Sequence, residues 1–137
     1  MTGAAATALA GLMIGSGAAR TVVPGYFRGL VPPWVPAPGV AVALSGAADV
    51  LAGVLLLRPA TRREGAWLAA GLVTAYLPAH LDPLRHASTA TSLFDRRPGI
   101  AARLVVNVGY IGWAVAVARG AEDLSRGRGA PRRARRG

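Results

Sequence analysis

The chain of 137 residues has no cysteine, no lysine and only two histidines, His80 and His86. Without cysteine it can form no disulfide, no thiolate metal site and no dithiol redox pair. The two histidines do not stand in HExxH or any related spacing, so no metal site is expected. Acidic residues are also scarce, six against sixteen arginines, and the net charge is +10.

A positive charge of this size would suit a protein that binds nucleic acid. The arginines, however, avoid the long apolar blocks, and seven of the sixteen lie between Arg119 and Arg136. This distribution is typical of loop charges that orient a membrane protein. A lipid bilayer is therefore the expected partner, and nucleic acid is not.

Apolar residues make up 53% of the chain and gather in four blocks. The blocks cover residues 4–23, 39–57, 65–81 and 100–118. A helix needs about 20 mainly apolar residues to cross ~30 Å of hydrocarbon, and the blocks are close to that length. A soluble bundle would show a polar stripe on each helix, which these blocks almost entirely lack. The sequence thus predicts an all-α fold, a four-helix transmembrane bundle over residues 1–119.

The first block has an alternative interpretation as a cleaved signal peptide. A signal peptide usually opens with a basic residue, whereas the first one here, Arg20, follows the apolar run. We therefore interpret the block as a helix of the bundle.

The segments between the blocks are polar or rich in proline. Residues 24–38 hold five of the ten prolines and predict an irregular loop whose aromatic rings suit the headgroup layer. Residues 58–64 predict a tight basic turn, and residues 82–99 a polar loop. The last segment, 120–137, predicts a disordered, arginine-rich cytoplasmic tail that binds anionic lipid headgroups.

The arginines also predict how the bundle lies in a cell membrane. Four spans place both termini and the 58–64 turn on one side, which then carries ten of the sixteen arginines. Because cytoplasmic loops of membrane proteins carry an excess of basic residues, we expect both termini in the cytoplasm.

Small residues are the expected contacts between these helices, because helices in lipid associate by close packing and hydrogen bonds. Gly11 and Gly15 lie four residues apart in the first block, and Gly46 and Gly53 lie one heptad apart in the second. We expect all four glycines to pack helices within the bundle. Formation of a homodimer through Gly11 and Gly15 is the alternative.

A single carboxylate, Asp49, interrupts the second apolar block. It lies about ten residues from the end of the block, which at ~1.5 Å per residue is near mid-membrane. An ionised aspartate there costs about 2.5–3.5 kcal/mol on insertion scales. We therefore expect Asp49 to face the bundle interior and to bind a partner.

Polar side chains on the other blocks can supply that partner. Arg103 and Asn107 share one helical face, Tyr76 and His80 share another, and Ser45 lies one turn from Asp49. The hypothesis is one internal cluster of Asp49, Arg103, Asn107, Tyr76, His80 and Ser45. In the structural interpretation, Asp49 and Arg103 form a buried ion pair that fixes helix register. In the functional one, the cluster binds a small polar or quinone-like ligand or passes protons.

The stretch "VVPGYFRGLVPPWVPAP" followed by "LSGAADVLAGVLLLRPATRREGAWLAAGLVTAYLPAH" resembles the DoxX family of small bacterial membrane proteins. The resemblance covers roughly residues 10–118 and implies a four-helix membrane bundle. It places the family's acidic position on Asp49, with glutamate shortened to aspartate, and its "P-A-N" motif on Pro78, Ala79 and His80. The family's "R-x-P-x-Q" motif falls on Arg103 and Asn107 in the last block.

The family's name comes from a membrane subunit associated with thiosulfate:quinone oxidoreductase. The resemblance therefore implies a non-catalytic accessory or anchoring subunit of a membrane-associated redox complex, with a redox enzyme or a second copy as partner. This chain would then need no catalytic activity and no cofactor of its own. A quinone-binding subunit of an oxidoreductase and a small proton-coupled transporter are the alternatives.

Overall fold

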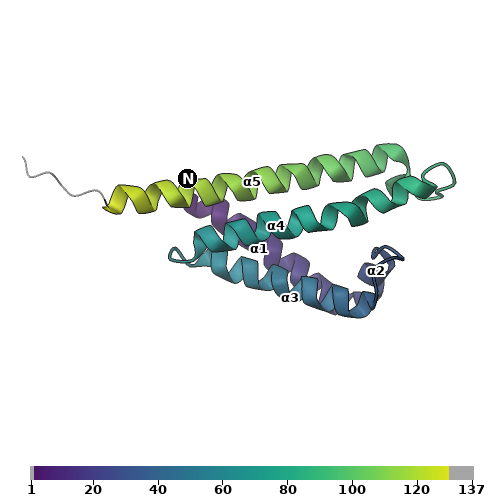
Figure 1. The fold of residues 1–137 in the computed structure, drawn as a ribbon, viewed down its shortest axis with the longest axis horizontal. Coiled ribbons are helices and arrows are strands. Elements are labelled where there is room, and N and C mark those ends of the chain that lie inside the picture. Colours follow the sequence, from purple (N-terminus) through teal and green to yellow (C-terminus); the bar gives the residue numbers. More distant parts are fainter. Residues whose placement is uncertain (1, 130–137) are drawn as a thin grey trace, which may run out of the picture.

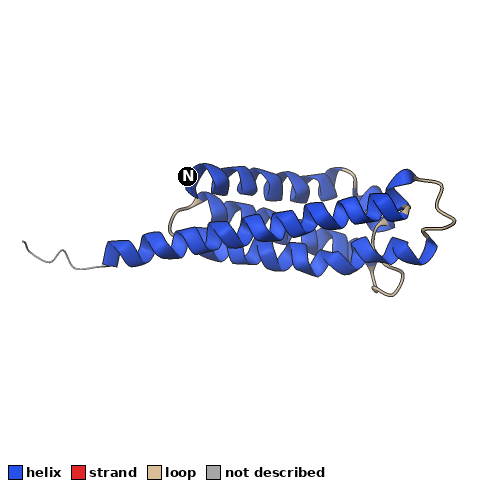
Figure 2. Ribbon diagram, turned by 90° about the horizontal axis from the view of Figure 1, so that it is seen from above, coloured by secondary structure: helices blue, strands red, loops and turns tan. Residues whose placement is uncertain are grey.

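Four long helices lie lengthwise beside one another in the computed structural model, which describes residues 2–129 (Figures 1 and 2). They are α1 (Thr2–Val22), α3 (Pro38–Leu57), α4 (Arg62–Leu81) and α5 (Arg97–Gly129). A short helix, α2 (Pro24–Gly29), and two 3-10 helices, η1 (Asp82–His86) and η2 (Leu93–Asp95), lie at one end. The described part contains no strand, which confirms the predicted all-α fold.

The helices pack in the order α1, α3, α4 and α5. α1 packs mainly on α3, and α4 lies between α3 and α5; within the described part, α5 makes no contact with α3. The buried core lies toward the end that holds the N-terminus, and alanine contributes most of it. Toward the other end, α4 and α5 diverge from α1 and α3 (Figure 1). The core comprises Ala6, Leu9, Ala10, Met13, Ala52, Leu56, Ala66, Ala69, Ala70, Ala114, Val117 and Ala118.

Glycines set the close approach of α1 and α3. A Cβ added to Gly53 would lie 2.5 Å from Ile14 Cγ1, and one added to Gly46 would lie 3.2 Å from Arg20 Cβ. Both glycines therefore pack helices as predicted. Gly17, which the sequence interpretation passed over, faces them from α1: its added Cβ would lie 2.5 Å from the Gly46 carbonyl oxygen.

The predicted packing role of Gly11 and Gly15 within the bundle is wrong. Both are exposed, and a Cβ added to either would meet nothing within 4 Å. The reason is the rotation of α1, which turns its Leu9 and Met13 face into the core instead. The row containing Gly11 and Gly15 therefore faces outward.

The predicted tight turn after α3 is present. Thr61 Oγ1 donates to the Leu55 carbonyl at 2.9 Å, and Arg62 Nε donates to the Leu56 carbonyl at 3.2 Å. These bonds satisfy carbonyls that the last turn of a helix leaves without partners. The turn thus joins α3 and α4 as an antiparallel pair.

Two segments are more helical than the sequence predicted. The irregular loop expected at 24–38 begins with α2, because proline at the first helical position needs no amide proton and has a helical φ. The tail expected to be disordered from residue 120 instead continues α5 to Gly129. There, Arg63 of α4 donates to Glu122 at 2.7 Å and tethers the extension. Residues 130–137 of the expected tail lie outside the described residues.

Two helices, α3 and α5, are long and apolar enough to cross a membrane, judged by length and composition. Only 33% of the relevant stretch of α3 and 17% of that of α5 is buried inside the molecule. The core helix of a soluble protein is mostly buried, so these low fractions agree with membrane association of α3 and α5.

Candidate functional site

Asp49 forms the centre of a polar cluster among three helices. Its side chain is 1% exposed, and it is the one buried charged residue in the described part. Oδ2 accepts from Ser16 Oγ at 3.0 Å and from Arg20 Nη1, while Oδ1 accepts from the Tyr76 hydroxyl at 2.8 Å. The carboxylate on α3 is thereby joined to α1 and α4, as the expectation of an inward-facing acid requires.

The partner predicted for Asp49 was wrong: it is Arg20, not Arg103. Arg103 lies on α5, which packs on α4 rather than on α3, and it forms no ion pair or hydrogen bond with the acid. Instead its Nη2 donates to Asp95 Oδ1 at 3.2 Å, in the loop just before α5. The order in which the helices pack therefore decides the ion pair.

Arg20 is held between two aromatic rings. Its guanidinium carbon lies 5.2 Å from the Phe27 ring centre and 5.0 Å from that of Tyr76, within the range of cation–π attraction. Nη1 also donates to Ser16 Oγ, one turn earlier, at 2.6 Å. Nε and Nη2 make no hydrogen bond within the described part, and the side chain remains 12% exposed. Arg20 thus holds Asp49 with one nitrogen and has donors to spare.

The sequence interpretation missed Ser16 and Arg20 as members of this cluster. A signal was present, because the two residues lie four apart and so share one face of the first block. Arg20 is also the one basic residue within that block, residues 4–23.

The remaining predicted site residues separate into two groups. Ser45 stays near Asp49: its carbonyl accepts from the Tyr76 hydroxyl at 3.3 Å, while its own hydroxyl donates to Val42. Asn107 donates within its own helix to the Arg103 carbonyl at 2.7 Å and does not join the cluster. The single predicted cluster is therefore two clusters, one around Asp49 and one around Arg103.

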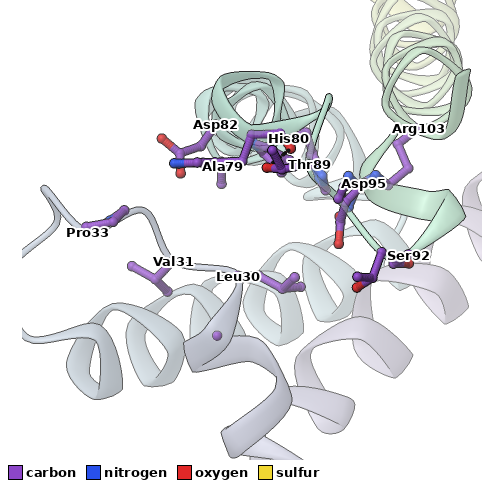
Figure 3. Close-up of a pocket in the computed structure, with 15 residues that line it drawn as sticks. Leu30, Val31, Pro33, Ala79, His80, Asp82, Thr89, Ser92, Asp95 and Arg103 are labelled. Atoms are coloured by element: carbon purple, nitrogen blue, oxygen red, sulfur yellow. Dashed lines mark hydrogen bonds and ion pairs between the residues drawn. The ribbon is translucent and has the colours of Figure 1, made fainter. Parts of the chain in front are cut away.

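His80 lies between these clusters and lines two cavities. The smaller, about 280 Å³, is mainly apolar and also borders Arg20 and Tyr76. The larger, about 510 Å³, is more polar and borders Arg103 and Asp95. Figure 3 shows the α2–α3 segment on one side of the larger cavity and the ends of α4 and α5 on the other. Both volumes are on the scale of small-molecule sites, ~300–1,000 Å³.

The side chains that line these cavities are aliphatic groups, aromatic rings and a smaller number of hydrogen-bond donors and acceptors. No three His, Asp or Glu side chains in the described part lie close enough to hold a metal ion. The arrangement is suited to binding a ligand with oxygen acceptors by hydrogen bonds from Arg20 and His80.

The fold and the site define the chain as an all-helical protein with an ion pair at its centre and a two-part cavity at one end. A family model described as a domain of unknown function (DUF8561) matches residues 9–118, most of the chain. The chain therefore belongs to that family. No curated protein and no solved structure matches it.

Proposed function

We propose that this chain is a multi-pass membrane protein whose four long helices all cross the bilayer. The apolar side chains exposed on the helix middles support this proposal: Leu44 is 66% exposed and Val105 is 72% exposed. An apolar surface of this extent is unfavourable in water but matches hydrocarbon. Ten of the sixteen arginines lie on the side of the termini and the 58–64 turn, which supports the cytoplasmic placement of both termini.

Within the membrane, we propose a non-catalytic accessory or anchoring role. The observation that carries this proposal is the engagement of Asp49 by donors from two neighbouring helices. An arginine side chain stays charged at every physiological pH, so Arg20 is a permanent counter-ion of the acid. Such an acid braces the three helices and is poorly suited to the cycles of proton release that a transporter needs. The DoxX resemblance supports the same role.

The outward face of α1 is the surface we propose for the partner. Along this face lie Ala4, Ala8, Gly11, Gly15 and Ala18, all exposed. Small residues at this spacing let a second membrane helix approach closely. The occupant is a redox-enzyme subunit or a second copy of the chain.

Cross-linking tests this proposal directly. Because the chain has no cysteine, any cysteine cross-link must involve the introduced residue. Gly15→Cys should cross-link to a neighbouring protein in native membranes, whereas Val108→Cys, 60% exposed on α5, should not. The mass of the adduct distinguishes a second copy from another subunit. Equal cross-linking from both positions, or none from Gly15→Cys, would refute partner binding on this face.

A quinone-binding subunit is the second candidate, favoured by the apolar cavity next to Arg20. Asp49 already balances the charge of Arg20, so its spare donors suit a neutral acceptor such as a quinone carbonyl. Solvent extraction of the purified protein should then yield quinone. Asp49→Asn should lose that quinone, while Arg103→Gln should retain it; no quinone in the wild-type extract rejects this candidate.

A further inference from the structure

The two cavities described above adjoin each other. Four residues line both of them: Leu30, Val31, Ala79 and His80. The shared wall lies between the α2–α3 segment and the end of α4, where the two helix pairs diverge. The two cavities, called the joined cavities from here on, therefore lie next to each other.

The polar cavity presents charges of both signs. Asp82 and Asp95 border it together with Arg103, and Asp82 Oδ1 also lies 3.6 Å from Nε of Arg85. The Ser92 hydroxyl accepts from the Phe94 amide and keeps its proton to donate, whereas the Thr89 hydroxyl already donates to the His86 carbonyl. Asp95 uses only Oδ1 and Arg103 only Nη2 in the ion pair that joins them. Acceptors and donors thus remain on both, which suits a zwitterionic group better than a simple anion.

The apolar cavity suits a hydrocarbon chain with a polar end near Arg20. Phe27, Trp34, Val35 and Val42 line it, and Arg20, which has spare donors, borders the same space. Trp34 is 60% exposed, and amphipathic aromatic rings settle at the headgroup level of a bilayer. The joined cavities therefore lie at the depth where a lipid's head, ester carbonyls and first chain carbons are found.

We propose that the joined cavities bind one zwitterionic phospholipid with a primary-amine head, taken from the leaflet opposite the chain termini. Its ammonium donates to Asp82 and Asp95, its phosphate accepts from Arg103 and the Ser92 hydroxyl, and an ester carbonyl accepts from Arg20. One acyl chain lies along the apolar cavity. This inference rests on the membrane insertion proposed above.

The lining distinguishes a primary amine from the other common heads. A quaternary ammonium has no N–H to donate and is usually held by aromatic rings. The described lining of the polar cavity contains no phenylalanine, tyrosine or tryptophan. Arg85 and Arg103 are already paired with Asp82 and Asp95, so these four groups carry no net positive charge to hold a purely anionic head.

The test is native mass spectrometry of the full chain, purified in detergent and exchanged with equal amounts of defined lipids. The panel contains phosphatidylethanolamine, phosphatidylcholine, phosphatidylglycerol and a quinone with a long isoprenoid tail. We expect one molecule of phosphatidylethanolamine per chain, retained about tenfold over phosphatidylcholine, which corresponds to ~1.4 kcal/mol. The Asp82→Asn, Asp95→Asn double variant should lose this preference, whereas Asp123→Asn, exposed on the far end of α5, should keep it.

Three outcomes would overturn the proposal. Equal retention of the ethanolamine and choline lipids rejects the amine contact, and preferred retention of phosphatidylglycerol rejects the zwitterionic site. Retention of the quinone in place of phospholipid rejects the proposed occupant and supports the second candidate function. Recovery of the chain from a membrane-free extract without detergent would instead reject membrane insertion itself, so the two proposals fail separately.

Discussion

Replacing Arg20 by methionine tests most directly whether the contacts of Asp49 hold the three helices together. The methionine keeps much of the arginine's apolar stem but removes the guanidinium, which leaves the buried carboxylate with only Ser16 and Tyr76 as donors. Breaking a buried ion pair by removing one partner costs ~3–5 kcal/mol. Because Arg20 is 12% exposed, we expect Arg20→Met to lower the free energy of unfolding by about 3 kcal/mol, near the lower end of that range.

Two further variants separate the charge from the hydrogen bonds. Tyr76→Phe removes the one hydroxyl proton that Asp49 and the Ser45 carbonyl share. Interhelical hydrogen bonds in membrane proteins contribute ~0.6 kcal/mol on average and ~1.7 kcal/mol at most. We therefore expect a loss of about 1 kcal/mol, well below that of Arg20→Met. An Asp49→Leu, Arg20→Met double variant should lose less than Arg20→Met alone, because no charge is left buried.

The measurement is reversible unfolding in mixed micelles with increasing dodecyl sulfate, followed by helicity. Arg103→Met is the matched control: its ion pair with Asp95 is partly exposed, and exposed pairs contribute at most ~1 kcal/mol. Equal losses for Arg20→Met and Arg103→Met would refute the assignment of the brace to Arg20. A double variant less stable than Arg20→Met alone would refute the charge argument.

Three other variants test the packing, the turn and the end of α5. Gly53→Leu should lower the free energy of unfolding by about 1–3 kcal/mol or more, because the new side chain meets α1. Gly11→Leu, whose side chain enters open space, should change it by no more than ~0.5 kcal/mol in the same assay. Thr61→Val removes the hydroxyl bond to α3 and should cost about 1 kcal/mol; an unchanged midpoint would contradict that bond. The hydrogen bond from Arg63 lowers the pKa of the Glu122 carboxyl, four residues beyond the expected span. This contact therefore stabilises the folded chain at pH values above the pKa of glutamate in the unfolded chain, ~4.3. Its contribution is lost as the pH falls through the lower pKa that Glu122 has in the folded chain. Proteolysis of the α5 extension should accelerate in that acidic range; an Arg63→Gln variant with the same pH profile as the wild type would contradict the assignment.

The long helices could be predicted because apolar runs of spanning length leave few alternatives. The inward position of Asp49 followed from the cost of exposing a carboxylate to hydrocarbon. Its partner did not follow, because depth alone leaves both Arg20 and Arg103 within reach. Only the packing of α1, rather than α5, against α3 chooses between them. That order depends on the shapes of many small contacts, which no single stretch of sequence displays.

The glycines show the same limit on a smaller scale. Gly11 and Gly15 have the more familiar spacing, yet Gly17, Gly46 and Gly53 form the contact between α1 and α3. Spacing identifies which residues share a helical face but not which way that face turns. The rotation of α1 is set by what its other faces carry, above all the core side chain of Leu9 and the ion pair of Arg20.

α5 is much longer than the other three long helices of the bundle. At ~1.5 Å per residue, its 33 residues extend about 50 Å, whereas the hydrocarbon layer is ~30 Å thick. This one helix thus begins beside the larger cavity, runs along the whole bundle and projects beyond it at the end where the N-terminus lies (Figures 1 and 2). A small tilt of α5 about its end at the cavity would therefore displace its projecting end much further, because displacement grows with distance from the point of rotation.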